Sequence, residues 1–275
     1  MNITASQVNE LRKRTGAGMM DCKNALKESE GDMEKAIDYL RKKGQKMAAK
    51  RADREASEGV VIASVSDDMK YGAIVMVNCE TDFVAKNADF VNYTKNIADL
   101  ASKHKVKDIE ELKMLELDGR KVADTVIDQT GVIGEKIELG TFRFIESEAI
   151  AAYIHPGNRL ATILGLNKNV NNAAQIGREI AMQVAAMDPV AVDESDVPKD
   201  VIDREIEIGM DQARQEGKPE AILEKIAMGK LNKFYRENTL LNQDFVRDTK
   251  KSVRAYLSEI DKDLTVTEFQ RVMLG

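Results

Sequence analysis

The sequence predicts an α+β protein in which a small helical module precedes a core of strands and covering helices. Apolar residues recur at helical spacing over about the first 45 residues, and β-branched runs such as GVVIASVS (59–66) and AIVMVN (73–78) follow. The order strand, turn, strand, helix then occurs twice, at 59–103 and at 149–187. We therefore expect two related α+β halves, each a hairpin covered on one face by a helix.

Residues 1–45 are expected to form a compact module of three short helices. Thr4 and Gln7 give a capping-box pattern at the start of the first helix, TGAG (15–18) joins it to the second, and Gly44 is expected to end the third. The inward faces should carry apolar residues at helical spacing, namely Val8, Leu11, Met20, Ala25, Leu26, Ala36, Ile37 and Leu40.

The rest of the chain divides where the pattern changes. A basic segment at 46–57, rich in Ala, Lys and Arg, is expected to be a helical and solvated linker. Residues 58–147 then form the first core half and residues 148–275 the second. Further elements are expected as helical stretches at 107–115 and 119–131, a strand at 135–146, a helix near 249–260, and a final strand in 264–274 that rejoins the core sheet.

Residues 198–237 depart from this plan and are interpreted as an inserted antiparallel helical hairpin. Gly217 suits the end of the first helix and Pro219 the first turn of the second. Small and apolar residues spaced three or four apart form the expected seam, and charged residues cover the other faces. The hairpin should therefore project from the core as a coiled coil. Its role stays open among pairing of two copies of the chain, binding of a further protein and stiffening of the core. The alternative is two ordinary helices that cover the core.

Composition and charge exclude several classes of function. No apolar run approaches the roughly 18 residues that span a bilayer, and the N-terminus lacks the apolar core of a signal peptide, so we expect a cytoplasmic protein without membrane contact. Residues 1–55 carry 13 basic and 9 acidic side chains, a net of +4, which leaves −10 for the rest because the whole chain carries −6. This acidic body, with no Trp, argues against nucleic acid as a direct partner.

Motifs that carry covalent chemistry or hold a cofactor are missing from the sequence. Phosphate-binding glycine motifs, GxSxG and HExxH do not occur, and TGAG joins two predicted helices instead of following a strand. Cys22 and Cys79 lack metal-ligand spacing and are expected to be buried thiols. His155 lies at an exposed hairpin tip without a nucleophile or an acid pair beside it. We expect no cofactor and no enzymatic activity.

The segment NCETDFVAKN (78–87) places Phe83 beside Asp82 where a buried strand ends. One interpretation is structural, with Thr81 or Asp82 capping a turn and Phe83 packed under the next helix. A second is a binding wedge, in which the ring fills an apolar pocket of a partner and the carboxylate takes over hydrogen bonds or cation contacts there. A third, with Asp82 as a general base, lacks a matching acid or electrophile in the sequence. The residues alone favour the structural interpretation.

Two stretches resemble a known family and change this balance. ELRKRTGAGMMDCKNALKESEGDMEKAIDYLRKKG (10–44) and VNCETDFVAKN (77–87) resemble the two signatures of the elongation factor Ts family, the guanine-nucleotide exchange factors of elongation factor Tu. Weaker similarity extends, in family order, through EKIELGTFRF, IHPGNRL, GKPEAILEKIAMGKLNKF and VRAYL. The resemblance implies a UBA-like domain at 1–45, paired core subdomains at 58–147 and 148–275, and a coiled-coil insertion at 198–237.

The resemblance also implies which residues contact elongation factor Tu. The segment Thr81, Asp82, Phe83 and Val84 would enter the magnesium and phosphate site of that GTPase. It would displace Mg²⁺ and distort the nucleotide site, so that GDP leaves and GTP replaces it. Further partner contacts are implied at Arg12, Thr15, Met19, Met20 and His155.

This chain departs from the family pattern at two places. Familiar members continue beyond the last strand into a short C-terminal helical module that also contacts the partner, whereas this sequence ends at FQRVMLG. We therefore expect neither that module nor its contact. IHPGNR carries a proline, Pro156, that is not expected at this tip in familiar members. The rival hypothesis is an interaction scaffold without exchange activity, in which the basic segment 41–54 contacts RNA.

Overall fold

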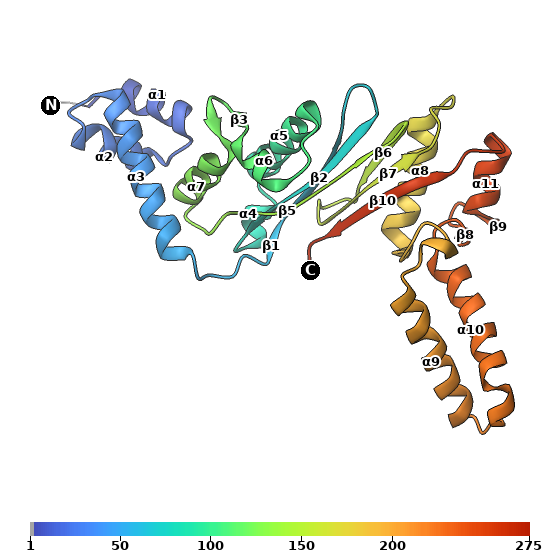
Figure 1. The fold of residues 1–275 in the computed structure, drawn as a ribbon. Helices are drawn as coiled ribbons and strands as arrows, with labels where there is room; N and C mark the ends of the chain where they lie inside the picture. Colours follow the sequence, from blue (N-terminus) through green and yellow to red (C-terminus); the bar gives the residue numbers. More distant parts are fainter. Residues whose placement is uncertain (1–2) are drawn as a thin grey trace.

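Four parts follow one another along the molecule in Figure 1: three N-terminal helices, a first sheet with its helices, a second sheet with its helices, and a long helical hairpin. The computed structural model describes residues 3–275. Both larger sheets are antiparallel and are covered by helices. The predicted α+β class is therefore confirmed.

The N-terminal helices are α1 (Ala5–Thr15), α2 (Met19–Glu28) and α3 (Met33–Arg51). The predicted capping box forms between Thr4 and Gln7. The shared core of the three helices consists of Val8, Leu11, Ala17, Cys22, Ala25, Leu26, Ala36 and Ile37. The prediction that Met20 faces inward is wrong, because Cys22 and Leu26 occupy the inner face of α2 and leave Met20 65% exposed.

The prediction that Gly44 ends α3 is also wrong, because the helix continues to Arg51. Gly44 is buried where α3 crosses α7 (Val122–Ile133), and a Cβ atom at Gly131 of α7 would lie only 2.7 Å from the Gly44 Cα atom. Glycine within a helix costs about 1 kcal/mol relative to alanine. At this crossing, glycine lets the backbones of α3 and α7 approach each other more closely than side chains would allow. The first residues of the expected linker are therefore a continuation of α3, which lies beside α7 in Figure 1.

The first sheet has the strand order β1-β2-β5. Its elements are β1 (Glu58–Val65), β2 (Tyr71–Cys79), β5 (Glu138–Glu146), the covering helix α5 (Ala88–His104), α6 (Ile109–Met114), and the short ladder of β3 (Glu116–Leu117) and β4 (Arg120–Lys121). Side chains alternate along β2, as strand geometry requires. Ala73, Val75 and Val77 join the core that includes Ile97 of α5, whereas Ile74 faces the second sheet.

The second sheet has the order β10-β7-β6, so the predicted final strand does rejoin the core. Its elements are β6 (Ala149–Ile154), β7 (Leu160–Leu166), β10 (Val266–Met273), the covering helix α8 (Ala173–Met187), the ladder of β8 (Asp244–Phe245) and β9 (Asp248–Ser252), and α11 (Val253–Ile260). The helix predicted from residue 249 starts only at Val253. The residues before it pair as β9 instead, and the Ser252 side chain caps α11.

The two sheets pack face to face, which gives the layers helix, sheet, sheet, helix. Apolar side chains from both sheets form one buried cluster between them, made of Val61, Ile74, Ile145, Ile150, Ala161, Ile163, Val272 and Leu274. Gly72 permits a close approach of the sheets, since a Cβ atom there would lie 2.7 Å from the Ile150 Cγ2 atom. The core thus carries β1 and β2 on a stiff double layer.

The hairpin consists of α9 (Lys199–Gln215) and α10 (Leu223–Asn238), which project away from the sheets in Figure 1. Gly209 and Ala227 lie at the seam, where a Cβ atom on Gly209 would come within 3.1 Å of the Ala227 Cα atom. Gly217 ends the first arm in the left-handed region, with φ of 73°. The predicted antiparallel hairpin is therefore confirmed.

Candidate functional site

The turn after β2 holds the four residues that the resemblance singles out. Thr81 is extended, with φ −126° and ψ 153°, and it precedes the single helical turn α4 (Asp82–Ala85). Val84 packs against the first core, whereas the neighbouring Phe83 is 83% exposed. The structural interpretation is therefore wrong for Phe83, which does not pack under the next helix, whereas Thr81 does occupy the N-cap position of α4, without a side-chain capping bond.

Asp82 carries a negative charge next to the exposed ring. Its Oδ2 atom lies 2.6 Å from the Lys86 Nζ atom, and the hydrogen bond from Lys86 lowers the Asp82 pKa. The side chains of Asp82 and Lys86 are 47% and 76% exposed, so the ion pair contributes little stability and leaves the carboxylate accessible. The turn presents a phenyl ring and a carboxylate to solvent together.

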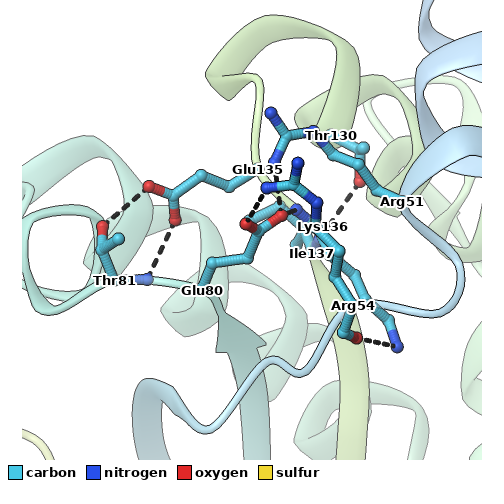
Figure 2. Close-up of polar contacts among 8 residues, drawn as sticks. All are labelled: Arg51, Arg54, Glu80, Thr81, Thr130, Glu135, Lys136 and Ile137. Atoms are coloured by element: carbon cyan, nitrogen blue, oxygen red, sulfur yellow. Dashed lines mark hydrogen bonds and ion pairs between the residues drawn. The ribbon is translucent and has the colours of Figure 1, made fainter.

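Glu80 anchors the start of this turn to two other parts of the chain. Its carboxylate accepts hydrogen bonds from Arg51 Nη1 at 2.6 Å, from Arg54 Nη1 at 2.9 Å and from the Lys136 backbone N–H at 2.6 Å (Figure 2). Burial acts to raise the Glu80 pKa, but the three donors together outweigh it and lower the pKa to about 2. Glu80 is therefore ionised at neutral pH and joins the end of α3 to the residues before β5.

Glu135 holds the next residue of the turn through both of its oxygens. Its carboxylate accepts the Thr81 backbone N–H at 3.0 Å and the Thr81 hydroxyl at 2.7 Å (Figure 2). The Ile137 N–H donates to the Thr130 hydroxyl at 3.2 Å. These contacts explain why β5 begins at Glu138 and not at residue 135, because the backbone N–H groups of Lys136 and Ile137 donate to Glu80 and to Thr130 of α7 instead of to a strand.

His155 lies on the tip between β6 and β7, and this tip contacts the start of β1. The Asn158 carbonyl accepts the Val61 N–H at 2.7 Å, and β1 begins opposite the end of β2 in their ladder. His155 itself is exposed, with its Nδ1 atom 2.9 Å from the Tyr153 hydroxyl. The structure thus places the His155 tip and the Phe83 turn at the same end of β1.

The remaining expected contacts gather around the turn between α1 and α2. Arg12, Met19 and Met20 are exposed there. Gly16 makes the turn possible with φ of 71°, and its N–H donates to the Arg12 carbonyl. Thr15 is half-buried, and its hydroxyl donates to a carbonyl of α1. The expected contact residues of this turn, Arg12, Thr15, Met19 and Met20, thus lie on the N-terminal helices and not at the β2 turn.

Sequence reasoning missed the residues that hold the turn. Arg51 and Glu80 are 29 positions apart, and Thr81 and Glu135 are 54 apart. No local spacing relates such distant residues. The one signal in the sequence is that the expected linker contains two arginines, Arg51 and Arg54. Their charges suggest an acidic partner, which in the structure is Glu80.

Among residues 3–275, the structure contains no cluster of three or more His, Cys, Asp or Glu suited to a metal ion. Cys22 and Cys79 are buried, and burial raises the pKa of Cys79 to about 12. Within the same residues, no helix is both long and apolar enough to cross a membrane. The site suits binding through an exposed ring and a carboxylate.

Comparison with known proteins points to one family. The family model described as Elongation factor TS matches residues 80–275. The proteins named elongation factor Ts in Christiangramia forsetii and Cytophaga hutchinsonii are each 52% identical to this chain, over 273 and 275 residues, and the alignments cover 99% of the chain and of each relative. The Flavobacterium psychrophilum protein of that name is 49% identical over 273 residues, with the same coverage. The chain therefore belongs to the elongation factor Ts family of translation elongation factors.

Proposed function

We propose that the chain binds elongation factor Tu and promotes the release of GDP and its exchange for GTP. The exposed Phe83 ring beside the Asp82 carboxylate is the observation that supports this proposal most strongly. Burying a phenylalanine contributes about 1.5–3 kcal/mol, and this fold forgoes that contribution at Phe83. A partner that receives the ring recovers it, and aromatic anchors of this kind contribute about 2 kcal/mol or more to an interface.

Exchange of this kind requires no covalent step. Mg²⁺ in a nucleotide site binds phosphate oxygens and protein oxygens, so its loss removes the largest local positive charge from the phosphates. We assign Phe83 to the separation of partner elements at this site. Asp82 then competes for the groups that hold the water shell of the metal, and Thr81 and Val84 set the direction in which both side chains point.

The other contacts hold the partner while the wedge acts. We assign this role to Arg12, Met19, Met20 and His155, which are exposed on two further surfaces. Thr15 contributes through the shape of its turn, because its hydroxyl is used within the module. By linkage, the nucleotide must weaken binding of this chain by the same factor by which the chain weakens nucleotide binding.

The experiment is fluorescent-GDP release from elongation factor Tu, with the wild-type chain and the double variant Asp82→Ala and Phe83→Ala. We expect the variant to form the complex but to release GDP about 30-fold more slowly, since it loses an anchor of about 2 kcal/mol. Equal release rates would contradict the wedge. An interaction scaffold without exchange activity predicts no acceleration even by the wild-type chain, and an enzyme with Asp82 as a base predicts turnover without the GTPase.

Two further expectations stay predictions. Pairing of two chains through the hairpin is consistent with the partial exposure of Ile208 and Met228, at 41% and 44%. Light-scattering masses of the chain with and without residues 199–237 test it, because only the intact chain should form a dimer. A cytoplasmic location follows from the proposed partner, the GTPase of translation elongation.

A further inference from the structure

We propose that Glu80 and Glu135 are positioning residues that orient the Phe83 wedge, and that Arg51 ties this orientation to the N-terminal helices. The proposal rests on the proposed function, because it concerns how the same turn acts on the partner. Neither carboxylate is assigned a contact with the partner. Each acts through the backbone of the turn.

The wedge cannot hold its own direction. Helix α4 has four residues, and its N-cap residue Thr81 makes no side-chain capping bond to it. A single helical turn is unstable by itself, because fixing its dihedral angles costs more than one hydrogen bond returns. The orientation of Phe83 must therefore come from contacts outside α4.

Val84 packs against the first core on one side, and the two carboxylates supply the polar contacts directly before α4. Glu80 accepts three hydrogen bonds and Glu135 accepts two, the latter both from Thr81. The side chains of Glu80 and Arg51 are only 15% and 24% exposed, in contrast to the exposed pair of Asp82 and Lys86. Charge-assisted hydrogen bonds in such partly buried positions are stronger and shorter than neutral ones. They fix the turn on its inner side and leave the outer side to the ring.

Arg51 connects this cluster to the N-terminal module. It is the last residue of α3, the helix that crosses α7 at Gly44. Figure 2 shows the Arg51 and Arg54 guanidinium groups converging on Glu80, with Glu135 and Lys136 beside them. When the N-terminal helices dock on a partner, α3 and this cluster hold the wedge at a defined place relative to them. Such preorganisation lowers the cost of ordering on binding.

A tryptophan reporter tests the positioning without any partner. The chain contains no Trp, so Phe83→Trp introduces a single tryptophan at the wedge, which can be excited selectively over the tyrosines. We expect Glu135→Ala and Glu80→Gln to increase its fast local motion, measured as the rapid component of the anisotropy decay. The matched control is Glu148→Gln, which removes an exposed carboxylate that pairs with Lys70 at 2.9 Å and should leave the decay unchanged.

The second arm measures GDP release from elongation factor Tu. The Phe83 anchor is worth about 2 kcal/mol, or about 30-fold in release rate, and a misoriented ring loses part of it. We therefore expect Glu135→Ala to lower the maximal release rate about tenfold, with a smaller change in the half-saturating concentration. In a Phe83→Ala background the same change should have no further effect, since it acts through the ring. Arg51→Lys should retain more activity than Arg51→Met, because it keeps one donor to Glu80.

The outcomes separate the two proposals. If Phe83→Ala releases GDP as fast as the wild-type chain, the proposed function fails, and the role in exchange of the two carboxylates fails with it. If Phe83→Ala is slow, but Glu135→Ala and Glu80→Gln leave both release and the anisotropy decay unchanged, only the positioning role is overturned. Losses that multiply in the Phe83→Ala background, with an unchanged decay, overturn it as well, because they indicate a general loss of folded chain.

Discussion

The crossing of α3 and α7 sets where the N-terminal helices sit, and it yields a quantitative prediction. A Cβ atom at Gly131 would lie 2.7 Å from the Gly44 Cα atom and 3.4 Å from the Gly44 nitrogen. Both neighbours are backbone atoms, so Gly131→Ala must separate the helices. Overpacking of this kind costs about 1–3 kcal/mol, and the better helix propensity of alanine returns at most about 1 kcal/mol.

We therefore expect Gly131→Ala to destabilise the contact by about 1–2 kcal/mol, which raises the population of the separated state about tenfold. Hydrogen exchange followed by mass spectrometry should show this as faster exchange in peptides from α7 and the second half of α3. Gly229→Ala in α10 is the matched control, because a Cβ atom there would meet no neighbouring heavy atom within 4 Å. It should slow exchange in the hairpin. Slower or unchanged exchange in α3 and α7 of Gly131→Ala would show that the two glycines do not hold the helices in close contact.

Three further predictions concern acid stability, thiol reactivity and the hairpin seam. The Glu80 pKa is lowered from 4.5 to about 2, so its stabilising contribution is complete above pH 4.5 and is lost as the pH falls toward 2. Between about pH 5 and pH 3, the urea midpoint of Glu80→Gln should therefore fall less than that of the wild-type chain; an equal fall would show that the cluster does not couple to folding. Burial raises the pKa of both Cys22 and Cys79, so iodoacetamide at neutral pH should modify neither until the chain is denatured, and rapid labelling of the folded chain would contradict this. Gly209→Leu should push α9 from Ala227 and speed hydrogen exchange in both arms; protection equal to that of the wild-type chain would show that the seam is not close-packed there.

Local pattern was sufficient for much of the fold. The capping box at Thr4, the repeated order of strands and helix, and the glycine at position 217 each depend on residues close in sequence, and the structure contains all three. The sequence also drew attention to Phe83 beside Asp82, although residue patterns alone favoured a buried ring. Exposure of Phe83 depends on Val84 taking the inner position, which no periodicity over four residues reveals.

Tertiary contacts decided the features that the sequence did not predict. Gly44 resembles a helix end in the sequence, but it lies in the middle of α3 because another glycine packs against it. The Glu80 and Glu135 cluster joins three segments that are far apart in the chain. Its members are ordinary charged residues in sequence, and only the fold brings their opposite charges together.

The dependence of GDP release on Mg²⁺ is the sharpest test of the wedge mechanism. Fluorescent-GDP release from elongation factor Tu is measured with the wild-type chain and with the Asp82→Ala and Phe83→Ala double variant, first with millimolar Mg²⁺ and then with EDTA. If the wedge acts by displacing the metal, GDP release in millimolar Mg²⁺ should be much faster with the wild-type chain than with the double variant. In EDTA, where no metal remains to be displaced, the two release rates should become similar. A difference between the two chains that is equally large in EDTA would contradict metal displacement.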